Sequence, residues 1–248
     1  MKVVFLGTNG WYSSETGHTT CILLDTTESY VILDAGSGIY KITEHIRDNK
    51  PIFLFLSHFH FDHICGLHIL NKFNFDKGLV ICCYKGGRDI LNTVVRQPYT
   101  LPFERLSYRV MINELDEGYH NSFPFKVECR KLVHATDCLG YRFEFGTKVI
   151  TFCTDTGYCN SILKLSKNAD LLMAECALAS GQKSVVWPHL NPEEAAEIAK
   201  RSNVKRLALV HFDAVIYNTM DKRRLAEKRA KEIFESVVIA NDGMVLEI

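Results

Sequence analysis

The heptapeptide Ser57-His58-Phe59-His60-Phe61-Asp62-His63 places four side chains that can bind a metal ion within six consecutive positions. It directly follows Ile52–Leu56, a short and wholly apolar run. A run of this length with a turn signal before it predicts a buried strand. The histidines therefore begin where a strand ends. An ordinary solvated loop seldom has this composition, so we interpret the heptapeptide as a metal-binding loop.

The four side chains do not all point the same way. In an extended segment alternate side chains share a face, so His58 and His60 can bind one ion together. Asp62 and His63 begin a helical pattern, which turns the chain and directs this second pair elsewhere. One loop thus offers two different sets of ligands.

Length and composition limit the class of protein. The chain has 248 residues, of which 47% are hydrophobic, and no linker, repeat or low-complexity tract divides it. We therefore expect a single domain spanning residues 1–248. Lysine and arginine together number 29, as do aspartate and glutamate. This balance gives no global positive field and argues against an extended nucleic-acid interface.

No apolar run approaches the roughly 20 residues of a membrane span, and the first residues show no signal-peptide pattern. These observations predict a cytoplasmic protein without a membrane partner. The sequence leaves the oligomeric state open, a homodimer included.

Three further side chains of ligand type follow short apolar runs that predict strands: His134, Asp155 and His211. In α/β sheets the carboxyl ends of several strands meet at one edge, and binding sites are built there. A lone histidine after a strand is usually a structural residue. Three such strand ends together with the histidine loop predict that all seven side chains meet in one site.

The remaining pattern predicts alternating strands and helices. Asp34 ends a predicted hairpin strand, where it is either a turn former or a carboxylate that orients a metal-bound imidazole. The segment Tyr99–Glu104, with its prolines and aromatic residues, is either a cover over the site or a surface connection. Further strands are expected at 2–6, 19–25, 30–33, 79–83, 108–112, 125–129, 141–152 (a hairpin) and 170–174, and helices at 39–48, 64–72 and 88–95.

Two helices are expected in the last third of the chain. Asn191-Pro192-Glu193-Glu194 combines an N-cap with proline at the first helical position, a strong helix start. Asp221–Val237 has small and apolar residues on one side. We expect its basic residues to form a solvated outer face: Lys222, Arg223, Arg224, Lys228, Arg229 and Lys231.

Nine cysteines, an odd number without a Cys-x-x-Cys pair, do not predict a disulfide framework. We expect reduced thiols packed in the core. Cys65 and Cys176 lie near candidate site residues, so a metal-thiolate role stays open beside simple packing.

The pattern His-x-His-x-Asp-His resembles the signature of the metallo-β-lactamase-fold hydrolases. Asp34-Ala35-Gly36 is similar to the first motif of that family, and His58–His63 to the second. The third, fourth and fifth motifs would be His134, Asp155 and His211. The resemblance implies an α/β fold, a four-layer αβ/βα sandwich with two central mixed sheets, helices outside and the metals at one edge.

The resemblance also implies a ligand set for two divalent cations. The first cation would be held by His58, His60 and His134. The second would be held by Asp62, His63 and His211, with Asp155 bridging the two. Imidazole and carboxylate ligands favour Zn²⁺, although Mn²⁺, Ni²⁺ or Fe²⁺ would fit similar ligands.

Within that superfamily the details look like the ribonuclease Z branch. Phe5–Thr8, His134–Thr136, Leu139–Phe143 and Leu171–Glu175 are similar to that branch, as is His189-Leu190-Asn191-Pro192-Glu193-Glu194. This resemblance makes His189 the general acid and Glu175 a candidate partner for it. An exposed histidine before a helix cap is the structural alternative for His189.

One departure from that branch changes the expected substrate. Ribonuclease Z carries a long arm between its third ligand and its bridging aspartate, with which it grasps transfer RNA. Here only about twenty residues separate His134 from Asp155, which leaves room for little more than a hairpin. The resemblance then points to armless relatives that cleave a small or cyclic phosphodiester or a short nucleic acid.

The implied reaction is hydrolysis by a water that the two cations activate. Asp62 would bind metal and orient that water, and His189 would protonate the leaving group. Three alternatives remain open: a ribonuclease Z-type endonuclease acting at transfer-RNA 3′ ends, a thioester, lactone or β-lactam hydrolase, and a metal-binding protein without turnover.

Overall fold

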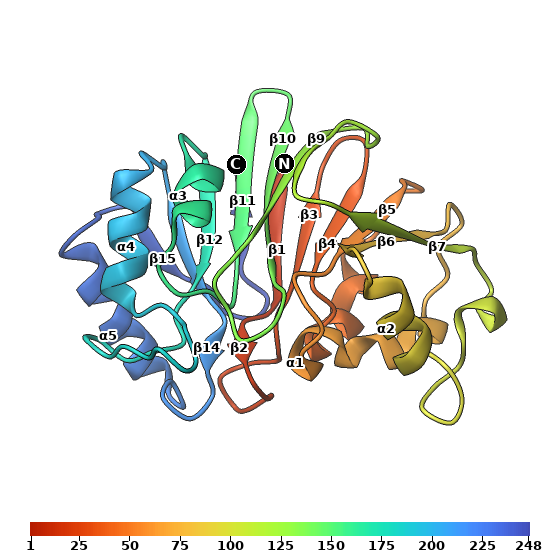
Figure 1. The fold of residues 1–248 in the computed structure, drawn as a ribbon, viewed down its shortest axis with the longest axis horizontal. Coiled ribbons are helices and arrows are strands. Elements are labelled where there is room, and N and C mark those ends of the chain that lie inside the picture. The colour runs from red at the N-terminus through yellow and green to blue at the C-terminus, as the bar shows by residue number, and fades with distance from the viewer.

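The computed structural model describes residues 1–248 and is built around two seven-stranded sheets (Figure 1). The first sheet has the order β16-β1-β3-β4-β5-β6-β7, and the second has the order β15-β13-β12-β11-β10-β9-β8. The strands of the first sheet are β1 (Lys2–Gly7), β3 (Cys21–Asp25), β4 (Tyr30–Leu33), β5 (Ile52–Phe55), β6 (Leu79–Tyr84), β7 (Val110–Leu115) and β16 (Val245–Glu247). Those of the second are β8 (Gly118–His120), β9 (Lys126–Lys131), β10 (Leu139–Phe145), β11 (Lys148–Cys153), β12 (Leu171–Glu175), β13 (Leu207–Val210) and β15 (Val237–Ile239).

Alternating side chains of the central strands fill two apolar layers. In β1, Val3 and Phe5 pack between the two sheets, whereas Val4 and Leu6 pack on the outer face of the first sheet. The strand β12 divides its side chains in the same way between the inner core and the outer core of the second sheet. Because both faces of these strands are buried, their sequences are almost wholly apolar. The inner core therefore joins the sheets face to face.

Helices cover the two outer faces, on opposite sides of the molecule in Figure 1. The 3₁₀ helices η1 (Ser37–Glu44) and η2 (Cys65–Lys72), with α1 (Phe61–Ile64), η3 (Phe103–Arg105) and α2 (Gly87–Val94), belong to the first sheet. The helices α3 (Asn160–Ser166), α4 (Pro192–Arg201) and α5 (Met220–Lys231) cover the second. The order helix, sheet, sheet, helix confirms the predicted four-layer αβ/βα sandwich.

The helix start predicted at Asn191 is present. The Asn191 Oδ1 atom accepts the Glu194 backbone N–H at 2.8 Å, and Pro192 occupies the first turn. A side-chain cap of this kind typically stabilises a helix by about 1 kcal/mol. The expected helices 39–48 and 64–72 are mostly 3₁₀ in form. The short strand β2 (Asn9–Gly10) pairs in parallel with β14 (Phe212–Asp213).

The prediction for the last helix was wrong in two respects. The helix α5 ends at Lys231, and Val237 begins β15, which pairs in parallel with β13. The β-branched run after Ser236 favours a strand over a helix. Arg223 was expected on a solvated face, but its side chain is fully buried.

Buried Arg223 ties α5 to the loop that follows β1. Its guanidinium donates to the hydroxyl groups of Thr8 at 3.0 Å and Thr16 at 3.3 Å, and to the side-chain oxygen of Asn9. The guanidinium also lies 4.4 Å from the centre of the Phe212 ring. Burial lowers the pKa of Arg223 to about 10, so the group is charged at neutral pH. A cation that is buried so completely persists because these oxygen atoms surround it.

Replacing Arg223 with alanine should lower the free energy of unfolding by about 3–5 kcal/mol, because it removes several hydrogen bonds and leaves a cavity. Denaturant titration measures this change. The neighbouring Arg224 is exposed and pairs only with Asp221, so Arg224→Ala is the matched control and should stay within about 0.5 kcal/mol of the unchanged protein. Equal stabilities of the two variants would contradict the anchoring role.

None of the helices combines the length and the apolar character that crossing a membrane requires.

Candidate metal centre

All seven predicted ligands lie together at the edge where the parallel strands end. The loop after β5 and the start of α1 supply four of them: His58, His60, Asp62 and His63. The other three, His134, Asp155 and His211, follow β9, β11 and β13 of the second sheet. Both sheets therefore contribute ligands, and the site lies where their edges meet.

Three positions at this edge have an unusual backbone. Asp34, Asp155 and His211 have φ angles of 56°, 51° and 50°, in the left-handed region that residues with a Cβ atom rarely adopt. Asp34 and His211 directly follow the last residue of a strand, and Asp155 is separated from the end of its strand by one residue. Such conformations cost of order 1–3 kcal/mol each and are concentrated at functional sites. The backbone turns sharply there so that the side chain points into the site.

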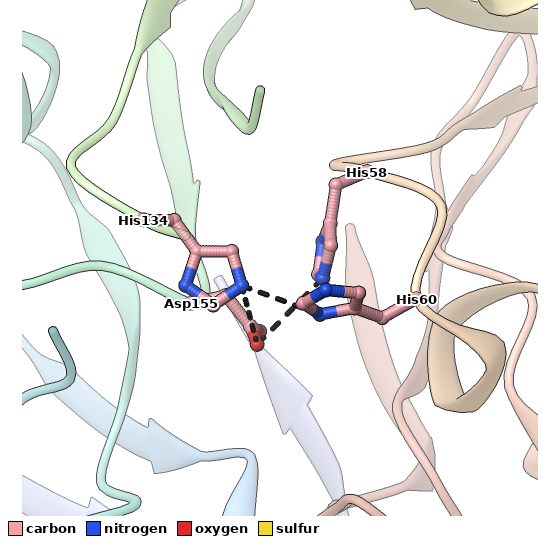
Figure 2. A group of neighbouring side chains, drawn as sticks. All are labelled: His58, His60, His134 and Asp155. Carbon is pink, nitrogen blue, oxygen red and sulfur yellow. Dashed lines mark hydrogen bonds and ion pairs between the residues drawn. The ribbon is translucent and has the colours of Figure 1, made fainter. Parts of the chain in front are cut away.

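One group of donors consists of His58, His60, His134 and Asp155, whose donor atoms lie within 4.8 Å of one another (Figure 2). Asp155 Oδ2 is 3.8 Å from His58 Nε2 and 3.8 Å from His134 Nε2. His134 Nε2 is also 3.3 Å from His60 Nδ1. The three imidazoles and the carboxylate thus surround one point.

A second group consists of Asp62, His63 and His211. The Nε2 atoms of His63 and His211 lie 3.1 Å apart, and each is 3.2 Å from Asp155 Oδ1. Asp62 Oδ2 lies 3.3 Å from His63 Nε2 and 3.4 Å from His211 Nε2. Asp155 therefore turns one oxygen to each group, as a bridging ligand would.

The donor atoms fit cations better than they fit one another. His58 Nε2 is buried without a hydrogen-bond partner. Burial lowers the pKa of His58 and lowers that of His134 to about 4, so both imidazoles are neutral and keep a lone pair for a ligand bond. Burial by itself would also lower the pKa of His63. The nearby carboxylates of Asp155, Asp62 and Asp34 outweigh burial, so the pKa of His63 is raised. Imidazole and carboxylate donors at such distances suit divalent transition metals.

Asp34 holds two of these imidazoles in orientation. Its Oδ2 accepts the Nδ1–H of His63 at 2.7 Å and the hydroxyl of Ser57 at 2.8 Å. The Ser57 hydroxyl in turn accepts the Nδ1–H of His58 at 2.9 Å, and the Ser57 backbone N–H donates to Asp34 Oδ1 at 2.7 Å. In the neutral form of each ring the hydrogen is therefore on Nδ1, which leaves Nε2 available to a metal ion. Of the two roles considered for Asp34, these contacts favour the orienting carboxylate.

Replacing Asp34 with asparagine should weaken metal affinity by about 10–100-fold, because an amide cannot fix both tautomers. Competition with a chelator of known affinity measures the change. Asp25, which ends β3 and pairs with Lys50 at 2.9 Å, offers the control Asp25→Asn, whose affinity should not change. Unchanged affinity in the Asp34 variant would remove its assigned role.

The loop after β1 also contacts the ligands, which the sequence did not reveal. The Trp11 backbone N–H donates to Asp62 Oδ2 at 2.8 Å. A Cβ atom on Gly10 would lie 2.5 Å from the His211 ring, so only glycine fits at that position. These contacts involve backbone atoms, for which residue type gives little signal. Ser57, the first residue of the histidine loop, also had no predicted role, although its hydroxyl links Asp34 to His58.

His189 and Glu175 form a pair beside the two groups. The Nδ1–H of His189 donates to both Glu175 oxygens, at 2.8 and 3.0 Å. Glu175 ends β12, is fully buried and also accepts the Thr156 backbone N–H. Burial opposes the charge on His189, but the Glu175 carboxylate outweighs burial and raises the His189 pKa to about 9. Donor atoms of His189, Asp155 and His211 lie within 4.8 Å of one another.

Two features that the sequence left open lie outside the ligand groups. The Cys176 thiol is buried and donates to the Tyr217 hydroxyl at 3.4 Å, and burial raises the pKa of both Cys176 and half-buried Cys65. Neither thiol is among the clustered donors, which favours packing. In the segment Tyr99–Glu104, the Thr100 hydroxyl donates to the His68 carbonyl at 3.0 Å. None of the hydrogen bonds of this segment reaches a site residue.

Comparison with known families places this geometry in context. Residues 21–212 match the family model described as the beta-lactamase superfamily domain. The Bacillus subtilis protein named probable metallo-hydrolase YhfI is 27% identical over 262 aligned positions, which cover all of both chains. Its crystal structure has a TM-score of 0.84 at 24% identity and covers 100% of this chain and 98% of that one.

Two ribonucleases of the same kind are also similar. Ribonuclease Z of Ligilactobacillus salivarius is 26% identical over 307 aligned positions, covering 98% of this chain and 95% of that protein. The crystal structure of the short form of human tRNase Z has a TM-score of 0.77 at 23% identity, covering 100% of this chain and 99% of that one. At this identity the structural likeness shows a shared fold.

Proposed function

The chain belongs to the beta-lactamase superfamily, and from this membership we propose that it is a dinuclear metal-dependent phosphodiesterase. Its substrate would be a small or cyclic phosphodiester or a short nucleic acid. Two divalent cations would be held by His58, His60 and His134 on one side and by Asp62, His63 and His211 on the other. Asp155 would be shared between them, and the donor set favours Zn²⁺.

The observation that carries this proposal is the position of His189. Its Nδ1 atom is bonded to buried Glu175, so the opposite edge of the ring is free to donate a proton. The ring lies beside the residues that would hold the cations. Cleavage of a phosphodiester expels an alkoxide, which is a poor leaving group unless it is protonated. A proton donor fixed at this place is what that reaction requires.

The size of the site region supports a small substrate. Between His134 and Asp155 the chain forms only the hairpin of β10 and β11. The alignment with ribonuclease Z needs 307 positions for a chain of 248 residues, whereas the alignment with YhfI needs 262. A net charge of zero also provides no extended surface for a polyanion.

The mechanism assigns each residue a separate task. Bound divalent cations would supply Lewis acidity, which lowers the pKa of a water and offsets charge in the transition state. Asp34 keeps the imidazoles of His63 and, through Ser57, His58 in the tautomer that binds metal. Trp11 fixes the Asp62 carboxylate through its backbone N–H, so that the remaining oxygen can orient the attacking water. His189 gives its proton to the departing oxygen, and Glu175 holds the ring in place.

A substrate panel tests the proposal. The protein, loaded with Zn²⁺ or Mn²⁺, would be assayed with bis-p-nitrophenyl phosphate, 2′,3′-cyclic nucleotides, a transfer-RNA precursor and an acyl thioester. We expect turnover of the phosphodiesters. Hydrolysis of the thioester with inert phosphodiesters would overturn the proposal.

The similarity to ribonuclease Z over 98% of the chain favours one second candidate, a transfer-RNA 3′-end endonuclease. Cleavage of the precursor at a single site, much faster than that of the cyclic nucleotides, would support this candidate instead.

A further inference from the structure

Trp187 stands at the rim of the candidate metal centre. Its side chain is 53% exposed, yet its ring centroid lies 6.2 Å from that of His60 and 6.4 Å from that of His134. The ring of His189 lies 5.3 Å from that of His134. Trp187 and the proposed proton donor are thus neighbours of the same ligand. A flat apolar surface borders the side of the site where the leaving group would depart.

The loop that carries Trp187 is anchored on both sides of the ring. The Trp187 backbone N–H donates to the Ser184 hydroxyl at 3.0 Å, and Pro188 packs so closely on Gly157 that an added Cβ would lie 3.0 Å from it. At the base of the loop, the Asn191 side-chain amide donates to the Gln182 carbonyl at 2.9 Å. The loop therefore holds an exposed indole in place, although nothing in the chain covers it.

Two neighbours of Trp187 in the same loop are also apolar and exposed: Val185 is 96% exposed and Val186 is 80% exposed. An exposed apolar group beside a polar site indicates a contact with a ligand or a partner. Aromatic faces stack on nucleobases whatever the base, because every base has a π face. Phe61 and Trp11 are also exposed near the site, but Trp187 is the aromatic ring that lies beside both His60 and His134, next to His189, where it could stack on a flat ring attached to a phosphodiester.

Building on the proposed function, we propose that Trp187 stacks on a nucleobase carried by the leaving group, so that the substrate is a nucleotide. His189 protonates the departing oxygen, which belongs to the sugar. The base on that sugar then lies against the indole. The chemistry selects a base-bearing phosphodiester over a sugar phosphate of the same size without a base.

Paired substrates test this inference. Wild-type protein and the variants Trp187→Leu, Trp187→Phe and Val185→Ala would be assayed with adenosine 2′,3′-cyclic phosphate and with ribose 2′,3′-cyclic phosphate lacking the base. Trp187→Leu should lower kcat/KM for the adenosine compound by about 5–100-fold and change that of the ribose compound less than about twofold. Trp187→Phe keeps a flat ring and should retain most of the preference. Val185→Ala, the matched control in the same loop, should behave like wild type.

A binding measurement decides the inference even where turnover fails. Calorimetric titration with adenosine 5′-monophosphate and with ribose 5-phosphate should show tighter binding of the nucleotide, and Trp187→Leu should abolish the difference. Inert phosphodiesters together with this binding preference would overturn the proposed function and the assignment of the base to the leaving group, but would still support base stacking on Trp187. Equal binding of the two compounds by wild type would overturn the inference alone.

A second copy of the chain covering Trp187 is the rival explanation. In that case Trp187→Leu would reduce the rates for both substrates equally and lower the mass measured by light scattering. That result would overturn the stacking role.

Discussion

Replacing His189 with alanine should slow cleavage of a cyclic nucleotide by about 10²–10⁴-fold while leaving the metal content unchanged. The alanine variant has no group to protonate the departing alkoxide, whereas none of the seven proposed ligands is altered. Glu175, 2.8 Å from the imidazole, would lose its partner but stay buried at the end of β12. Steady-state kinetics and metal analysis of the same preparation measure both effects.

The leaving group separates a proton donor from a merely structural residue. Nitrophenolate departs readily without a proton, so bis-p-nitrophenyl phosphate should be cleaved by the His189 variant at close to the normal rate. His120 donates to the Asp116 carbonyl at 2.8 Å on the strand β8, and His120→Ala is therefore a histidine control away from the site. A loss of metal from the His189 variant, or an equal loss with both substrates, would contradict the role as general acid.

Replacing Asp155 with alanine should reduce turnover of every substrate by at least about 10³-fold, because Lewis-acid stabilisation by the cations is worth several kcal/mol. Asp155 is the one proposed ligand that faces both groups, at 3.2 Å on one side and 3.8 Å on the other. Without it, five imidazoles and Asp62 remain to hold two positive ions at close range. We therefore expect fewer than two bound metals per chain.

Metal analysis after gel filtration, alongside the kinetics, checks this expectation. Asp137, exposed on the connection before β10 and paired with Lys131 at 2.9 Å, provides the control Asp137→Ala. Two tightly bound metals in the Asp155 variant would show that the carboxylate is not a shared ligand.

The fold could be predicted largely because its signals are local. Apolar runs such as Ile52–Leu56 and Leu207–Val210 mark buried strands, and a polar ligand directly after such a run marks the strand end. Where a strand is short and its partners lie far along the chain, the local signal is weak and can be outweighed by a neighbouring helical pattern. The strand β15 is the example: the small and apolar residues on one side predicted a helix up to Val237, but Val237 pairs in parallel with β13.

Arg223 shows a second reason for failure. Its neighbours Lys222 and Arg224 are exposed, so the helical pattern alone predicted a solvated residue. Its actual surroundings come from Thr8, Asn9 and Phe212, which are remote in sequence. Tertiary contacts of this kind override local pattern.

The candidate site also combines features that local sequence reveals with features that depend on tertiary contacts. The clustering of the seven proposed ligands could be inferred from residue type and position, and the pairing of His189 with Glu175 from the resemblance to the ribonuclease Z branch. The contact between the Trp11 backbone and Asp62 could not, because every residue except proline has a backbone N–H. The exposed ring of Trp187 also carried no signal, since its meaning depends on its distance from His60 and His134.

The division of the ligands between the two sheets bears on how the chain matures during synthesis. The histidine loop is synthesised early, and about 150 residues separate His63 from His211, the last of the proposed ligands. During that interval its four donors are open to any cation or to another nascent chain. The complete set of seven proposed ligands exists only after His211 has been made and the second sheet has docked, so a pair of ions that needs all seven would bind a nearly finished polypeptide.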